Sequence, residues 1–144
     1  MAEATNQLRV RLVTPEHILF ETLADAVELP ATTGYMEPLY GSAPLMAELG
    51  AGDVTLHGGE LDGAIYNVSW GFVEVLPDRV TILANDALKP EQIDVARAEK
   101  QLERGEQEWK DAGDSEEAYD AALHRIAEAE AKISSAQKKT VAAH

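Results

Sequence analysis

Hydrophobic and polar residues alternate with a period of two through the first part of the chain. In the segment QLRVRLVT, Leu8, Val10 and Leu12 fall on one face and two arginines on the other, as in a half-buried strand. Similar short segments follow, separated by turn signals at residues 32–34, 58–59, 62–63 and 77–78. This pattern predicts an antiparallel β-sandwich of about ten short strands.

The clearest hairpin in this region is FVEVLPDRVTILA, in which Pro77 suits the second position of a type I turn. Neither of its two strands has a distinctly polar face. We therefore expect these strands to lie inside the sandwich or beneath a partner protein.

In the last third of the chain the spacing of apolar residues becomes helical. Val95, Leu102 and Trp109 recur every seven residues, which predicts one amphipathic helix. This helix is expected to end near Asp111, with Gly113 as its left-handed cap.

A second helix is expected to follow Asp114 as its N-cap, with Glu117 completing a pair that resembles a capping box. Its predicted apolar side consists of Ala118, Ala122, Leu123, Ile126, Ala129 and Ile133. The two helices are therefore predicted to form a hairpin that ends in a polar tail.

The change from strand-like to helical sequence occurs at Pro90, which suits the first position of a helix. The predicted fold class is α+β, an N-terminal antiparallel β-sandwich followed by a C-terminal antiparallel α-helical hairpin. The predicted domains are a sandwich at residues 1–88, a hairpin at 89–137 and a polar tail at 138–144.

The predicted hairpin is intrinsically weak. Alanine side chains bury little area at about 25 cal/mol per Å², whereas ordering each residue costs roughly 1 to 2 kcal/mol. Gly105 in the first helix costs about 1 kcal/mol more than alanine would. The hairpin therefore needs another surface or a ligand to hold it, as a mobile element does.

The charge of the chain narrows the classes of partner. A formal net charge of -14 repels phosphate backbones and anionic lipids, so neither nucleic acid nor direct membrane binding is expected. The chain has no cysteine and four scattered histidines, so no metal site is predicted. The sequence shows neither a pair of carboxylates placed for acid–base catalysis nor a phosphate-binding glycine loop, so independent catalysis is not expected. A basic protein is the natural partner.

Four segments in order resemble the epsilon subunit of bacterial F-type ATP synthases. The first two are VTPEHILFE and the loop GSAP, which follows the family's glycine, histidine, x, proline pattern apart from Ser42 in place of histidine. The others are VSWGFVEVLPDRVTILA, in which Trp70 replaces a glycine, and IDVARA at the start of the hairpin. The resemblance covers nearly the whole chain.

The resemblance implies two groups of site residues. A loop facing the c-ring would include Tyr35, Met36, Glu37, Tyr40 and Ser42. An ATP-binding group would include Ile93, Asp94, Arg97, Ala98, Arg104 and Arg125. Guanidinium groups suit phosphate because they offer paired donors, although Ala129 stands where the family has a further arginine.

The same motif also fits a purely structural role. Asp94 favours the positive end of the helix dipole and can pair with Arg97 three residues later. The sequence leaves both explanations open.

The function implied by the resemblance is that of a non-catalytic rotor subunit in the central stalk. Its implied partners are the gamma subunit, the c-ring and, when the hairpin is extended, the alpha and beta subunits. No cofactor is required, and ATP would act only as a regulator. The implied location is peripheral, on the cytoplasmic side of the bacterial inner membrane. The alternative is a stand-alone β-sandwich module that binds a ligand and dimerises through its helices.

Overall fold

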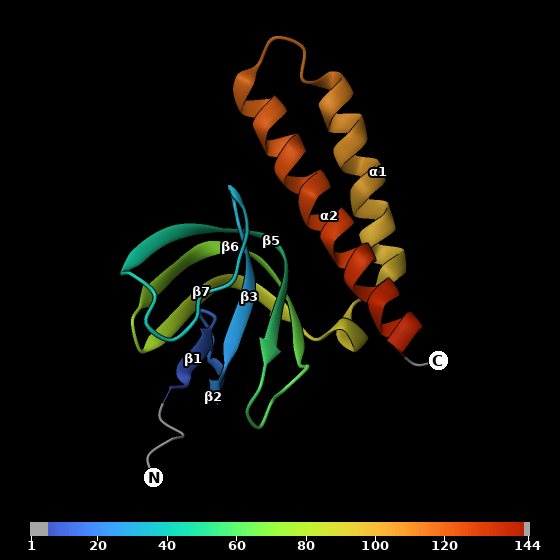
Figure 1. The fold of residues 1–144 in the computed structure, drawn as a ribbon. Helices are drawn as coiled ribbons and strands as arrows, with labels where there is room; N and C mark the ends of the chain where they lie inside the picture. The colour runs from blue at the N-terminus through green and yellow to red at the C-terminus, as the bar shows by residue number, and fades with distance from the viewer. Residues whose placement is uncertain (1–5, 143–144) are drawn as a thin grey trace. The chain divides into compact units, whose positions relative to one another are not determined.

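The structure is a computed structural model that describes residues 6–142, with side chains up to residue 138. The chain divides into two compact units between Leu88 and Lys89. The first unit is built from strands and the second from helices (Figure 1).

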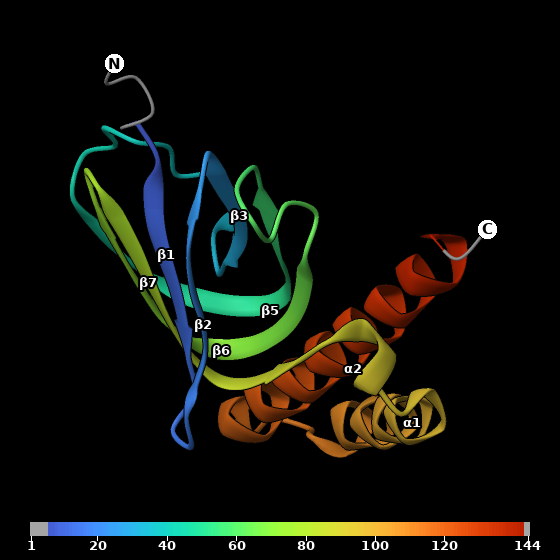
Figure 2. The same ribbon diagram turned by 90° about the horizontal axis from the view of Figure 1, so that it is seen from below.

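The described residues of the first unit form seven strands. They are β1 (Leu8–Val13), β2 (Ile18–Ala24), β3 (Ala26–Ala31), β4 (Gly34–Met36), β5 (Leu45–His57), β6 (Ile65–Leu76) and β7 (Arg79–Leu88). They form one continuous sheet in the order β2-β1-β7-β6-β5-β3-β4. The sheet curls into the two layers of a sandwich, and β5 and β6 are visibly curved (Figure 2). The predicted β-sandwich is therefore confirmed.

The core between the layers is aliphatic. Every strand except β4 contributes buried hydrophobic residues to it. The largest fully buried side chains include Leu8, Leu12, Leu29, Leu49, Leu56 and Ile82. The strict alternation along β1 arises because only one face of this strand meets the core.

The strand number differs from the prediction because long strands replace pairs of short ones. The segments AIYNVSW and FVEVL form the single 12-residue strand β6. Its core residues change from an even position, Val68, to the odd positions Val73 and Val75. The switch occurs at Trp70 and Gly71, whose φ angles are 60° and 132°. This irregularity reverses the inward face of β6 without ending the strand.

One pair of strands is parallel, which the prediction of an antiparallel sandwich missed. β1 and β7 run side by side in the same direction, with Val10 opposite Val80. All other paired strands are antiparallel, including the predicted β6–β7 hairpin with its Pro77–Asp78 turn. The parallel pair joins the two ends of the domain, so no local turn signal could reveal it.

The second unit is the predicted helical hairpin. A short 3-10 turn at Pro90–Gln92 precedes α1 (Val95–Asp111), and α2 (Glu116–Ala142) follows. The two helices lie side by side and are joined by a short loop at one end (Figure 1). Gly113 has a left-handed φ of 56°, as predicted for the residue after the first helix.

Two boundaries of the second helix differ from the prediction. Its cap is Ser115, whose Oγ accepts the backbone N–H of Ala118 at 3.2 Å, rather than Asp114. The helix also runs to Ala142, so the predicted tail is helical over residues 138–142, and residues 143–144 lie outside the described part. Lysine, glutamine and alanine favour helix, which explains the extension.

The buried faces of the helices are smaller than predicted. Val95 and Trp109 are exposed, whereas the buried residues of α1 are Ala98 and Gly105. On the predicted apolar side of α2, Ala122 and Ala129 are buried, Ile126 and Ile133 are half-buried, and Ala118 and Leu123 are exposed. The hairpin therefore buries small side chains and leaves several large ones in solvent.

Gly105 has a packing role that offsets its low helix propensity. A β-carbon at this position would lie 2.9 Å from Cγ1 of Ile126 and 3.6 Å from the carbonyl oxygen of Ala122. The absence of a side chain lets α1 and α2 approach closely here.

Candidate functional site

The polar residues of the predicted ATP site lie at different levels along the hairpin. The carboxylate of Asp94 accepts the backbone N–H of Arg97 at 3.1 Å and caps α1, while the Arg97 side chain is exposed. Arg104 is two turns further along α1, about 10 Å from Arg97 at 1.5 Å per residue. Arg125 projects from α2. The geometry therefore gives Asp94 the structural role that its sequence position also allowed.

Arg104 and Arg125 converge on Glu108, a residue that the sequence analysis did not identify. Arg125 Nε donates to Glu108 Oε1 at 2.6 Å, and Arg104 Nε lies 3.9 Å from Oε2 of the same carboxylate. The side chains of Glu108 and Arg125 are each 38% exposed. The spacing of four residues between Arg104 and Glu108 is the only local signal for this cluster, because Arg125 reaches it from the other helix.

The remaining residues of the predicted ATP site lack polar side chains or space. Ile93 is half-buried and Ala98 is buried. Ala129, at the position of the missing arginine, is 0% exposed. The predicted site residues that the structure brings together are therefore Arg104 and Arg125, and both already face the carboxylate of Glu108.

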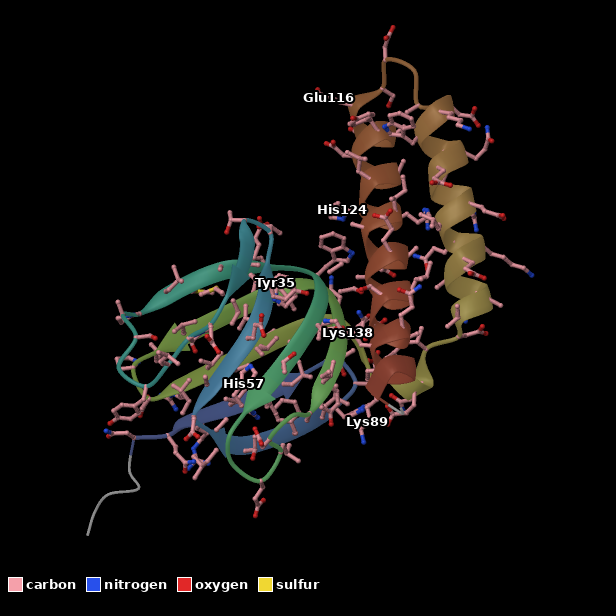
Figure 3. All side chains as sticks on the ribbon, turned by 45° about the vertical axis from the view of Figure 1, so that its right-hand side comes forward. Tyr35, His57, Lys89, Glu116, His124 and Lys138 are labelled. Carbon is pink, nitrogen blue, oxygen red and sulfur yellow. The ribbon has the colours of Figure 1, made fainter. Side chains whose placement is uncertain are left out.

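A second polar contact crosses between the helices nearer the start of α1. Gln101 Nε2 donates to Glu128 Oε2 at 3.4 Å, and Lys132 Nζ lies 3.5 Å from the same oxygen. Glu116 lies at the loop end of the hairpin and Lys89 at the opposite end (Figure 3). Polar contacts between the helices thus occur at two levels between these ends, and the one at Glu108 is an ion pair.

Two residues of the predicted c-ring loop are held by the sandwich. Tyr35 on β4 is 57% exposed, yet its hydroxyl oxygen accepts the backbone N–H of Asp53 at 3.0 Å. Met36 is half-buried and packs against the hydrophobic core. Of these two side chains, only that of Tyr35 presents a large exposed surface.

The other three residues of this loop lie between β4 and β5. Glu37 Oε2 is 3.8 Å from Nε2 of His57, which places this part of the loop beside the end of β5. Tyr40 is 46% exposed. Ser42 closes a turn, since its Oγ donates to the carbonyl oxygen of Leu39 at 2.7 Å and accepts the Leu39 N–H at 3.0 Å. Ser42 thus stabilises the loop backbone.

An apolar pair lies on the outer surface of the β6–β7 hairpin. Phe72 and Leu83 are opposite each other across the two strands and are 51% and 47% exposed. Met46 on the neighbouring strand β5 is 67% exposed. The weak polarity of this hairpin in the sequence is therefore explained by apolar side chains on its outer face as well as on its inner face.

A shallow, open hollow of about 380 Å³ lies beside the edge strand β2. Its lining includes Arg9 and Glu21, which pair with each other at 3.6 Å. The hollow is open to solvent, and its Arg9 and Glu21 side chains are already paired with each other.

The carboxylates and histidines of the described residues are not clustered as a metal site would require. Within residues 6–142, no cluster of three histidine, aspartate or glutamate side chains is placed to hold a metal ion. Neither helix of this described region has the length and apolar character needed to cross a membrane.

The family model for the beta-sandwich domain of the ATP synthase delta/epsilon chain matches residues 7–90. The chain is 42% identical over 104 residues to the ATP synthase epsilon chain of Koribacter versatilis, covering 71% of each. The chain belongs to the ATP synthase epsilon chain family. The epsilon chain of Solibacter usitatus is 38% identical over 135 residues, which cover 92% of this chain and 97% of that protein. The similarity between epsilon chains thus extends through the helical hairpin.

The fold of this chain also matches a solved structure. A chain in the cryo-EM structure of the Euglena gracilis mitochondrial ATP synthase OSCP/F1/c-ring assembly superposes with a TM-score of 0.73 at 18% identity. The match covers 97% of this chain and 84% of that one. A sandwich followed by a helical hairpin is therefore a fold shared with that chain. The family membership, rather than this likeness, removes support for a stand-alone ligand-binding module.

Proposed function

We propose that this chain is a non-catalytic subunit of the central stalk of an F-type ATP synthase. Membership of the epsilon chain family is the observation that carries the proposal. Catalysis would then take place on other subunits.

The proposed partners of the sandwich are the gamma subunit and the c-ring. The apolar pair Phe72 and Leu83 is suited to gamma because a half-exposed aromatic and aliphatic surface gains most from burial against protein. The loop that carries Tyr35 and Tyr40 is the proposed contact with the c-ring. Association with the membrane would then be peripheral and would come through the complex.

The proposed role of the hairpin is to regulate ATP hydrolysis. Its buried residues on α1 are alanine and glycine, so little apolar area holds the two helices together. Such an element can exchange its internal contacts for contacts with the alpha and beta subunits when it extends.

We propose that no cofactor is required and that regulatory ATP binds this hairpin weakly. Arg104 and Arg125 offer donors for phosphate, but Glu108 already occupies them and Ala129 supplies no charge. Titration of ATP without magnesium against the full chain and an Arg97→Ala variant tests this role. No binding by either protein would remove ATP from the proposal.

Truncation after Leu88 tests the regulatory role. In a reconstituted complex, loss of residues 89–144 is expected to raise ATP hydrolysis, because the inhibitory element is absent. A chain that lacks only residues 138–144 is the control for a disturbed C-terminus. Equal hydrolysis with the complete and the truncated chain would remove the regulatory role.

Copurification tests the stalk role separately. The tagged full chain, captured from its native membrane extract, is expected to recover gamma, alpha, beta and c subunits in mass spectrometry. Recovery of none of them, under conditions that keep the synthase intact, would contradict the assignment.

A further inference from the structure

The closed hairpin depends strongly on its polar contacts because little apolar surface is buried between its two helices. Ala98 and Gly105 are the buried residues of α1, and both are small. Trp109 and Tyr119, which meet with ring centroids 6.3 Å apart, are 44% and 41% exposed. A hairpin of this kind gains little from apolar burial, so one well-formed polar contact has a large relative effect.

Glu108 makes an ion pair that joins the two helices. Its Oε1 accepts from Arg125 Nε of α2 at 2.6 Å. Its Oε2 faces Arg104 Nε of α1 at 3.9 Å. One carboxylate therefore uses both oxygens, each toward a guanidinium group on a different helix, and the Arg125 contact is a charge-assisted hydrogen bond.

We propose that Glu108 is an internal latch that holds α1 and α2 together by occupying the position between the two arginines. The closed hairpin is then stabilised without a ligand. An external anion such as a phosphate group has to displace the Glu108 carboxylate before it can reach both guanidinium groups. The regulatory meaning of the latch rests on the proposed function of the hairpin, whereas the latch itself is a property of the isolated chain.

Hydrogen exchange of the isolated full chain, followed by mass spectrometry, tests the latch. In Glu108→Gln, the amides of α1 and α2 are expected to exchange about two- to fivefold faster than in the wild type. The matched control is Glu106→Gln, which removes the same charge from an exposed position of the same helix. Equal exchange in Glu108→Gln and Glu106→Gln would overturn the proposal.

A second variant, at the other partner of the contact, tests the proposal even if one substitution unfolds the hairpin. Arg125→Gln is expected to reproduce the effect of Glu108→Gln, and the double variant should exchange no faster than either single one, because both remove the same contact. Additive effects would overturn the proposal. In the wild type, about 1 M NaCl, where the Debye length is about 3 Å, should reduce protection more than it does in Glu108→Gln.

The outcome is separable from that of the hydrolysis experiment. Loss of the latch effect in the isolated chain would leave the result of truncation after Leu88 unchanged. Conversely, a latch without any change of hydrolysis on truncation would show a stable hairpin that lacks the proposed regulatory role.

Discussion

A β-carbon on Gly71 of β6 would collide with the carbonyl oxygen of Leu83 on β7. Gly71 also has a φ of 132°, which side chains of L-amino acids rarely tolerate. The collision and the backbone angle occur at the point where β6 changes its inward face. Gly71 therefore permits the bend on which the sandwich depends.

Gly71→Ala is expected to lower the free energy of unfolding of the sandwich by about 2 to 4 kcal/mol, through crowding and backbone strain. Urea unfolding measures this loss. The control is Gly63→Ala, where φ is 83° but no atom lies within 4 Å of the added carbon. That substitution should cost only about 1 kcal/mol. Similar losses for both variants would show that the approach to Leu83 is unimportant.

Phe72→Thr is expected to weaken binding of the full chain to the gamma subunit about tenfold or more, because it removes an aromatic anchor from the outer face. Threonine keeps a good strand residue at this position. The comparison variant is Leu39→Thr, which alters a residue that is 52% exposed in the loop after β4. Binding measured by calorimetry should change little for Leu39→Thr. A normal affinity of Phe72→Thr would exclude this face as the gamma contact.

Asp94→Ala is expected to destabilise α1 by about 1 kcal/mol through loss of its N-cap, whereas Asp94→Asn should retain most of the stability. Amide exchange of the first turn of α1 measures the difference. ATP affinity distinguishes a capping role from a phosphate-binding role. If Asp94 only caps the helix, the ATP affinities of the alanine and asparagine variants should not follow the order of their stabilities. Equal destabilisation by alanine and asparagine would contradict the capping role.

Ser115→Ala is expected to destabilise the start of α2 by about 1 kcal/mol, since the Oγ that accepts the Ala118 N–H is lost. Asp114→Ala should cost a few tenths of a kcal/mol, because its remaining effect is only a charge near the helix dipole. Hydrogen exchange over residues 116–119 compares them directly. A larger effect of Asp114→Ala would restore the cap predicted from the sequence.

Gly105→Ala is expected to loosen the hairpin despite a gain of about 1 kcal/mol in helix propensity. The added carbon would lie 2.9 Å from Ile126 Cγ1, and such overpacking costs about 1 to 3 kcal/mol. Amide exchange of α2 should therefore become faster. Combination with Ile126→Ala should remove the crowding. Unchanged amide exchange in Gly105→Ala alone would show that the two helices accommodate the added carbon without becoming less stable.

Features that depend on neighbouring residues could be predicted from the sequence. The alternation in QLRVRLVT, the Pro77–Asp78 turn and the left-handed Gly113 each follow from local geometry, and all three are found in the structure. The family motifs likewise lie in continuous segments, so they could be recognised without a fold.

The tertiary structure alone decided which distant residues meet. The parallel pairing of β1 with β7 joins Val10 to Val80, and the latch joins Glu108 to Arg125. Neither contact leaves a local pattern, because each depends on strand register or on the packing of two helices. The periodicity of one element shows which face is apolar, but it carries no information about the residue that another element places against that face.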